Sequence, residues 1–512
     1  MKTSGKNKFI TFIKANYKAL LLFFALLLLN VFLLCSNFFF SGLTFGKTFA
    51  FILIGSILLE IFLCVIIFIS KQKDWKIEKV FLLFGLVIGI VYVFAIPIGR
   101  APDEVSHFTR VYELSNGHFI SDIDDDGTIG SVEASNIEII RDFKENNVTY
   151  AEIFENLDLY PDESDQTFIE TSAYSYNIVS YLPHVIGMSL GKLLHLPLLA
   201  TVYLAKIFNL VACIAVLYFS IKYIPFLKNF IFLIAFFPIT MQAMSSLSPD
   251  GLLIATSFAL ISFVLYSIYE TKELFSKKHF LLMFTICFFL SMCKIAYAPL
   301  CLLLFAIPKE RFGSAKKKIA IIIGTGAIIF TFLLVWLLIA PSLQSQTDQA
   351  TQIGLILSNP LKYFAIILNS INTNIYMYLS NFLGGYLEWF NVLLSPLYII
   401  STFTIFVLLC SKEKTTVTKS LKYLAIAIFT IITILIFTTM FITWTKAGEL
   451  VIDGVQGRYF LPLALLIPII FLPTEKSPKK VAKITPSQNY YLYGFIVFES
   501  IYAITAIACT HL

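Results

Sequence analysis

The chain has 512 residues, of which 58% are hydrophobic and only 14% are charged. Soluble domains carry about 25% charged residues, so this composition excludes an ordinary water-soluble protein and indicates a chain surrounded mostly by lipid. The net charge of +6 conceals an uneven distribution, because residues 98–176 hold 18 of the 32 acidic residues but only 4 of the 38 basic ones.

Apolar segments that approach the length of a bilayer recur along the whole chain. A spanning helix needs about 20 mostly apolar residues, and the first such segment is too long to be the apolar core of a cleavable signal peptide. The fold class that follows is an all-α polytopic membrane protein with about thirteen transmembrane helices. The predicted spans are 19–40, 47–70, 79–98, 199–220, 228–246, 250–270, 279–293, 296–308, 318–340, 384–410, 420–443, 458–473 and 489–510.

Lysine-rich connections orient these spans. Because basic residues favour cytoplasmic loops, the lysines in 2–18 and 71–79 predict a cytoplasmic N-terminus and an extracytoplasmic loop over 98–198. All later lysine clusters then face the cytoplasm only if 174–195 does not cross. We therefore predict that 174–195 is a helix in the outer interface, that 360–378 resembles it, and that the C-terminus is extracytoplasmic.

A polar cluster follows the third span directly. Residues 99–110 read GRAPDEVSHFTR, so Asp103, Glu104, His107 and Arg110 fall within one short stretch. At spacings of three, the last three of these share one helical face. Charged groups at the membrane edge are costly unless they are paired or functional. A helix capped by Asp103, with ordinary salt bridges, is the structural alternative.

Three further polar positions are predicted at the same outer edge, on different segments. Asp250 lies in the turn before the sixth span, Lys294 lies between two short spans, and Arg458 with Tyr459 begins the twelfth. Lys294 and Arg458 are predicted on the outer side, although basic residues favour the cytoplasmic side of a membrane. Each therefore needs an anionic partner such as a carboxylate or a phosphate. Helix capping by Asp250 and interfacial anchoring by Arg458 are the structural alternatives.

These groups suit sugar transfer from a lipid phosphate. A carboxylate takes the proton of the acceptor hydroxyl, while cations stabilise the charge that develops on the departing phosphate. The candidates for binding the lipid phosphate and substrate are His107, Arg110, Asp250, Lys294, Arg458 and Tyr459.

A separate motif lies within the acidic segment. Residues 122–133 fit the calcium-loop pattern D-x-D-x-D-G-x5-E in full. In such a loop the carboxylates wrap one Ca²⁺ ion and order the chain around it. An acid-rich segment also makes a chance match easier, so both interpretations stay open, as does the need for a divalent metal at the active site. The candidate ligands are Asp122, Asp124, Asp126, Thr128 and Glu133.

Four motifs in the same order resemble a bacterial membrane-protein family catalogued as domain of unknown function 2142. The resemblance covers roughly residues 80–475, and that family is similar to the GT-C glycosyltransferases, whose first large outer loop carries the catalytic acid. It implies a polyprenyl-phosphate-linked sugar as donor and Asp103 or Glu104 as the catalytic base. The motifs are Pro102-Asp103-Glu104 with His107 and Arg110, LSPD at 247–250, KIAYAP at 294–299 and GVQGRY at 454–459.

The resemblance also implies a division of the chain. Residues 1–78 form an N-terminal tail with two additional helices, and 79–475 form a GT-C-like core whose first outer loop, 98–198, carries interface helices. Residues 476–512 form a cytoplasmic connection and a final span.

The sequence therefore predicts a glycosyltransferase of the bacterial plasma membrane. It would move a sugar from a polyprenyl-phosphate donor to an envelope glycan, lipid or protein acceptor on the outer face. The alternative is a transporter, flippase or polymerase of lipid-linked glycans, although no internal repeat is visible. A non-enzymatic calcium-sensing scaffold is a third interpretation. The expected partners are the donor, the acceptor and the lipid bilayer, and no nucleic acid.

Overall fold

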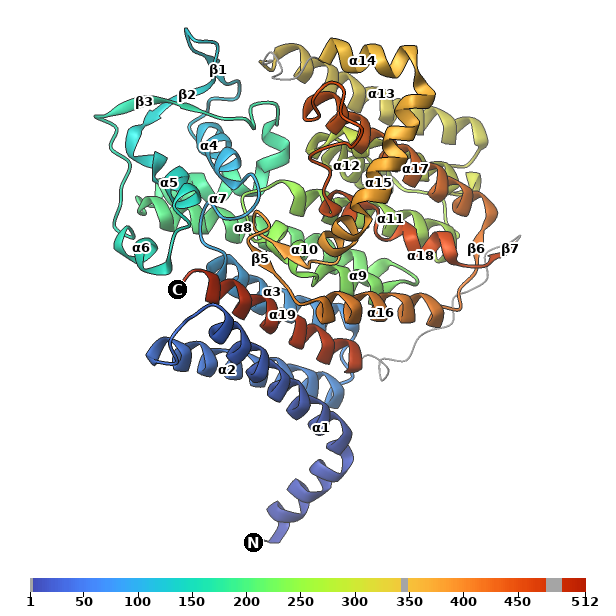
Figure 1. The fold of residues 1–512 in the computed structure, drawn as a ribbon. Helices are drawn as coiled ribbons and strands as arrows, with labels where there is room; N and C mark the ends of the chain where they lie inside the picture. Colours follow the sequence, from blue (N-terminus) through green and yellow to red (C-terminus); the bar gives the residue numbers. More distant parts are fainter. Residues whose placement is uncertain (1–2, 342–348, 476–489) are drawn as a thin grey trace.

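The computed structural model describes residues 3–341, 349–475 and 490–512, and most of them are helical (Figure 1). Within these residues, eight helices are long and apolar enough to cross a membrane. Each coincides with a predicted span, which confirms a mostly helical, polytopic membrane protein. The eight are α1 (Thr3–Phe40), α2 (Lys47–Gln72), α3 (Ile77–Ala95), α8 (Leu198–Tyr223), α11 (Asp250–Tyr269), α13 (Ala315–Ile339), α17 (Lys419–Thr443) and α19 (Tyr490–Thr510).

The other five predicted spans form short or broken helices, so thirteen full-length spans are not confirmed. Proline explains part of this irregularity, because it lacks the amide hydrogen that a continuous α-helix requires. Pro238 begins α10 after the break from α9, and Pro299 and Pro462 lie inside the 3-10 helices η3 and η5. Irregular backbone at membrane depth is tolerated only where protein or a water-filled cavity covers it. The five are α9 (Lys228–Ala235) with α10 (Pro238–Met244), α12 (Lys277–Cys293), the 3-10 helix η3 (Ile295–Ala306), α16 (Pro396–Lys412) after strands β4 (Tyr386–Leu387) and β5 (Val392–Leu393), and the 3-10 helix η5 (Gly457–Leu463) with α18 (Leu466–Phe471).

Helix α11 lies at the centre of the helical core. In this helix 89% of the apolar window is buried, whereas only 17% is buried in α13, which lies at the edge in Figure 1. Helices α8, α10 and α12 and the segment η5 all pack against α11. Because Asp250 is the first residue of α11, this central position keeps its carboxylate away from lipid.

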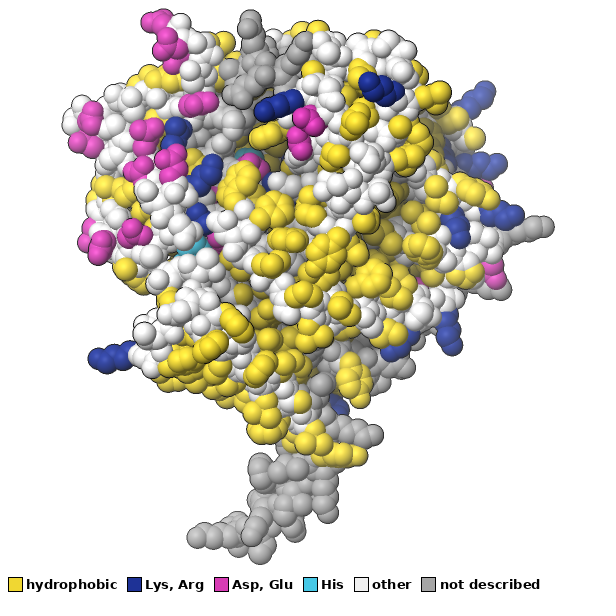
Figure 2. Space-filling model, in the orientation of Figure 1, with side chains coloured by type: hydrophobic (Ala, Val, Ile, Leu, Met, Phe, Trp, Pro, Cys, Tyr) yellow, Lys and Arg dark blue, Asp and Glu magenta, His cyan; other side chains and the backbone are white. Residues whose placement is uncertain are grey.

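Residues 98–198 form a smaller layer beside the core, in which three antiparallel strands lie in the order β1-β2-β3. Figure 2 shows acidic side chains gathered on this side and lysines at the opposite edge, near the strands β6 (Val417–Thr418) and β7 (Thr474–Glu475). This separation of charge is the pattern expected across a membrane. The elements of the layer are α4 (Glu104–Ser115), β1 (Asp122–Ile123), β2 (Ile129–Ala134), η1 (Ser135–Glu138), α5 (Ile139–Glu145), α6 (Tyr150–Glu155), β3 (Gln166–Glu170), η2 (Ile178–Tyr181) and α7 (Leu182–Leu193).

The segment 174–195 contains only one longer helix, α7, of 12 residues. At 1.5 Å per residue this helix is about 18 Å long, which is too short to cross a bilayer. Glycines allow it to lie directly against α8, since a Cβ atom at Gly187 would be 2.7 Å from the Cα atom of Ala205. The helix length agrees with the prediction that this segment does not cross.

The segment 360–378 differs from the predicted interface helix. It belongs to α15 (Pro360–Phe382), which has 23 residues and bends by 109° relative to the preceding α14 (Gln349–Ser358). The pair has the geometry of a broken span or a re-entrant loop. The short 3-10 helix η4 (Lys309–Arg311) precedes α13, and the predicted cytoplasmic connection at 476–489 lies outside the described residues.

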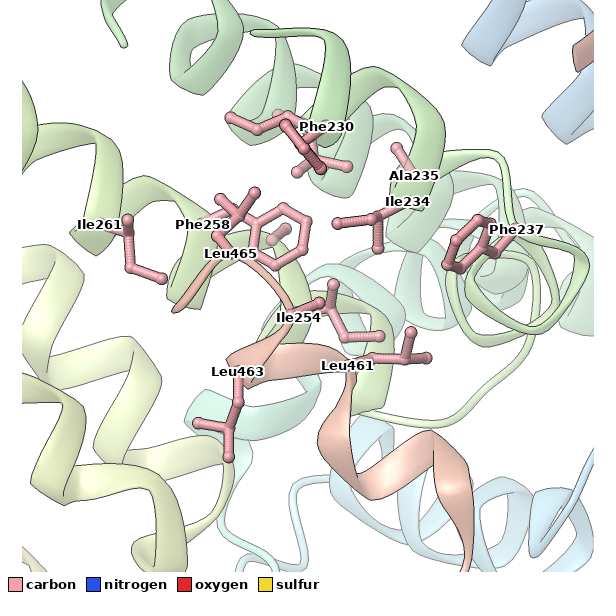
Figure 3. Close-up of a cluster of buried hydrophobic side chains, with 14 of the residues drawn as sticks. Phe230, Ile234, Ala235, Phe237, Ile254, Phe258, Ile261, Leu461, Leu463 and Leu465 are labelled. Carbon is pink, nitrogen blue, oxygen red and sulfur yellow. The ribbon is translucent and has the colours of Figure 1, made fainter. Parts of the chain in front are cut away.

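Segment η5 is fixed from two sides. A Cβ atom at Gly457 would lie only 1.9 Å from the carbonyl oxygen of Tyr378, so only glycine allows this close approach to α15. On the other side, Leu461 of η5 and Leu465, just after it, pack among buried side chains of α9 and α11 (Figure 3). The backbone around residue 458 is therefore held rigidly between three helices.

We expect Gly457→Ala to displace η5 and to destabilise the protein by about 2–3 kcal/mol, because overpacking of a close backbone contact forces the neighbours apart. Thermal unfolding of the purified chain in detergent measures this change. The matched control is Gly55→Ala in α2, where no atom lies within 4 Å of the added Cβ. Equal melting temperatures for the two variants would contradict the packing described for η5.

Candidate functional site

Four charged side chains from four distant parts of the chain meet beside α4. The Nζ atom of Lys294 lies 2.6 Å from Oδ1 of Asp250, and the Nη2 atom of Arg458 lies 2.9 Å from Oδ2 of Asp103. The Nη1 atom of Arg458 also lies 3.8 Å from Oδ2 of Asp250. Arg458 thus bridges two carboxylates, and we call these four residues the charged cluster.

The members of the charged cluster differ in their access to solvent. The Asp103 side chain is 43% exposed, whereas the side chains of Asp250 and Arg458 are 14% and 10% exposed. The Tyr459 ring lies 5.5 Å from the Lys294 ammonium and 5.4 Å from the Arg458 guanidinium, a distance at which an aromatic face attracts cations. Asp103 is therefore the carboxylate that a ligand reaches first.

Asp103 and Asp250 are not used as helix caps. Asp103 precedes α4 in a left-handed conformation with φ of 60° and makes no side-chain capping bond. The Asp250 carboxylate is likewise committed to Lys294 and Arg458. Both capping alternatives are therefore wrong. A left-handed residue other than glycine is uncommon and often marks a functional position.

Glu104 has a different environment from its neighbour Asp103. Its side chain is fully buried, and Oε2 accepts hydrogen bonds from the amides of Gly99 and Ala101 at 3.0 and 3.3 Å. Its Oε1 accepts from the Leu247 amide and lies 3.2 Å from Nζ of Lys206. Both oxygens of this carboxylate already have partners within the protein, so Asp103 is the more accessible of the two adjacent carboxylates.

Arg110 does not join the charged cluster, contrary to the sequence-based expectation that it binds phosphate. Its buried guanidinium lies 2.5 Å from the Glu113 carboxylate and donates to Ser121 and to the carbonyls of Phe119 and Tyr176. These bonds occupy its donors within the outer layer. Arg110 therefore holds that layer together.

His107 lies next to the charged cluster but adds no positive charge to it. Its Nδ1 atom lies 2.5 Å from the hydroxyl of Tyr181. Burial lowers the pKa of His107 to about 4, although the carboxylates of Asp103 and Asp250 favour the charged ring. The imidazole is therefore neutral near pH 7, and it contributes a hydrogen-bonding group rather than positive charge.

A small cavity of about 20 Å³ opens beside the cluster. Pro102, Gln242, Ser246, Asp250 and Arg458 contribute to its walls. This volume admits about one water-sized group. The Nε atom of Arg458 is buried without a hydrogen-bond partner, so one guanidinium donor is unused at the edge of the site.

The predicted calcium loop is a β-hairpin in the structure. Asp124 accepts hydrogen bonds from two amides of its own turn, and Glu133 accepts from Ser131 and from Asn116. Among the described residues, no group of three or more His, Cys, Asp or Glu side chains is placed to hold a metal ion. Calcium binding therefore stays a prediction, and it requires the side chains of this hairpin to rearrange. The residues concerned are Asp122, Asp124, Asp126, Thr128 and Glu133.

Two buried titratable residues that connect to the turn before Asp103 were not identified from the sequence. Glu388 follows strand β4, and His511 follows α19. Both are less than 3% exposed. The signal for Glu388 was a single carboxylate inside the apolar segment 384–410, where a span was predicted instead.

Comparison with known families gives one match. The family model described as predicted membrane protein (DUF2142) matches residues 86–467. No curated protein and no solved structure matches the chain. The matched range contains all four members of the charged cluster, whereas α1, α2 and α19 lie outside it.

The pKa of His107 predicts an acid-sensitive contribution to stability. An unfolded histidine has a pKa of about 6.5, so between pH 6.5 and 4 the unfolded chain binds a proton that the folded chain does not. Stability should therefore fall as the pH falls, by on the order of 3 kcal/mol in total.

Thermal unfolding of the wild type and His107→Gln between pH 7 and 4.5 measures this contribution. The variant should lose less stability than the wild type over this range. An identical loss in both proteins would show that His107 is not the group responsible.

Proposed function

This chain belongs to the DUF2142 family of predicted membrane proteins, and we propose that it is a glycosyltransferase that uses a polyprenyl-phosphate sugar donor. The acceptor would be an envelope glycan, lipid or protein. We further propose that the acidic layer of residues 98–198 faces outward, because the lysines lie at the opposite edge (Figure 2).

One observation carries the proposal: an accessible carboxylate lies beside two cations at the edge of the helical core. Asp103 is 43% exposed, and its carboxylate is held 2.9 Å from Arg458. Lys294 joins the same cluster through Asp250. General-base catalysis and binding of a phosphate leaving group require these two kinds of group side by side.

In the proposed reaction, Asp103 takes the proton of the acceptor hydroxyl. The acceptor oxygen forms a bond to the anomeric carbon while the bond from this carbon to the phosphate oxygen breaks. The electron pair of that bond leaves with the phosphate. Arg458 and Lys294 stabilise the added negative charge, and the free Nε donor of Arg458 offers a further hydrogen bond.

Glu104 has a supporting role in this proposal. Its carboxylate joins Lys206 of α8 to the turn before α4 and to the Leu247 amide. This pairing fixes the position of the residue that precedes Glu104, which is Asp103. Replacement of Asp103 should therefore lower sugar transfer, whereas replacement of Glu104 should lower stability.

We expect Asp103→Asn to lower sugar transfer by about 10²–10⁴-fold, the usual contribution of a general base, without lowering membrane abundance. The measurement is the envelope glycan profile of a deletion strain that carries each variant. Asp125→Asn, in the exposed turn between β1 and β2, is the matched control. Full transfer by Asp103→Asn would remove Asp103 as the base. Movement of labelled glycan across liposomes without cleavage would instead favour a transporter or flippase.

We expect Glu104→Gln to act on folding instead. Removing one charge of a buried pair leaves Lys206 uncompensated, at a cost of about 3–5 kcal/mol. The melting temperature of the purified protein should fall, whereas Glu155→Gln at an exposed position of α6 should leave it unchanged. A Glu104→Gln protein that is fully stable but inactive would return Glu104 to the role of base.

A further inference from the structure

A buried chain of polar contacts connects the end of α19 to the turn that carries Asp103. The Nε2 atom of His511 lies 2.7 Å from Oε1 of Glu388, and Oε2 of Glu388 lies 3.4 Å from Nη2 of Arg100. No side chain of this triad is more than 4% exposed. Arg100 stands three residues before Asp103, so the triad ends in the turn of the charged cluster.

The hydrogen bonds of His511 fix the number of protons that the triad holds. Its Nδ1 atom lies 2.8 Å from the carbonyl oxygen of Val148, and a carbonyl only accepts, so Nδ1 carries a hydrogen. A second hydrogen must lie in the contact of 2.7 Å between Nε2 and Glu388. The pair therefore holds one proton more than a neutral imidazole beside a carboxylate.

The neighbours of the pair favour placing that proton on His511. Arg100 contacts the other oxygen of Glu388 and keeps it a carboxylate. Lys144 of α5 lies over the Trp389 ring at 5.2 Å, and its carbonyl accepts from Arg100. Tyr150 of α6 also faces the pair, since its ring lies 6.1 Å from that of His511, and Glu388, Tyr203 and Cys509 all lie close enough to act on its hydroxyl.

Glu388 is also connected directly to the cavity of the charged cluster. Its amide donates a hydrogen bond of 2.8 Å to Oε1 of Gln242, which lines that cavity. Glu388 holds a left-handed backbone conformation with φ of 54°, which residues other than glycine adopt only where the surroundings enforce it. Glu388 thus contacts the end of α19 and the Asp103 turn through its carboxylate, and the cavity wall through its backbone amide.

We propose that Glu388 and His511 form a buried proton-binding site, and that the bound proton makes His511 a positioning residue for the Asp103 turn. The imidazolium and Arg100 each hold one oxygen of Glu388, and this contact anchors the end of α19 to the turn that carries Asp103. The proton site does not depend on the proposed function, whereas its importance for sugar transfer rests on that function.

Nitrogen-15 NMR of the full-length, histidine-labelled chain in nanodiscs tests the protonation state at pH 7.5. His511→Gln assigns the His511 signals by their disappearance. Both ring nitrogens of His511 should show the shifts of a protonated imidazolium, and Glu388→Gln should abolish this signature. An unprotonated ring nitrogen in the wild type would overturn the proposal without requiring any variant to fold.

Hydrogen exchange of the same full-length protein tests the positioning. We expect His511→Gln to speed exchange of the amides of residues 98–104 several-fold, whereas Leu512→Ala, next to it, should not. Unchanged exchange in His511→Gln would overturn the positioning role.

The two proposals fail separately. Faster exchange together with full sugar transfer in Asp103→Asn would overturn the proposed function alone. Unchanged exchange together with loss of transfer in Asp103→Asn would overturn the positioning of the turn alone.

Discussion

The constraint on which this structure depends is that a charge within an apolar core needs an opposite charge beside it. Lys206 lies in the middle of α8 and is neutralised by Glu104, and Lys294 is neutralised by Asp250. Each pair joins elements that are distant in the sequence. The pairs therefore fix how the helices sit around α11, and the same pairing brings Asp103 to Arg458.

Much of the fold could be predicted from the sequence because the length and hydropathy of a span are local properties. All eight candidate spans coincide with predicted segments. The failures occurred where apolar composition was interpreted as continuous helix. Pro238 follows a break, Pro299 and Pro462 lie in 3-10 rather than α-helical segments, and in 384–410 a short hairpin precedes the helix. Apolar content alone does not distinguish a span from a buried irregular segment that other helices cover.

The site could be predicted in part, because a charged side chain at the membrane edge requires a partner of opposite charge. This argument found Asp103, Asp250, Lys294 and Arg458, which the structure brings together. Helical spacing was a weaker guide, because it shows which residues share a face but not what that face contacts. Arg110 shares a face with Glu104 yet pairs with Glu113. Glu388 carried the same signal, as a single carboxylate inside the apolar segment 384–410, but its partner His511 depends on tertiary structure and could not be identified from the sequence.

The position of α19 has a consequence for how members of this family differ. This helix and His511 lie outside the matched residues 86–467, yet His511 contacts Glu388, which lies inside them and is paired there with Arg100. A relative that shares only the matched core would keep the pair with Arg100, but the other oxygen of that buried carboxylate would need a different hydrogen-bond donor. Covariation between position 388 and the segment after the core would therefore show how relatives satisfy that second oxygen.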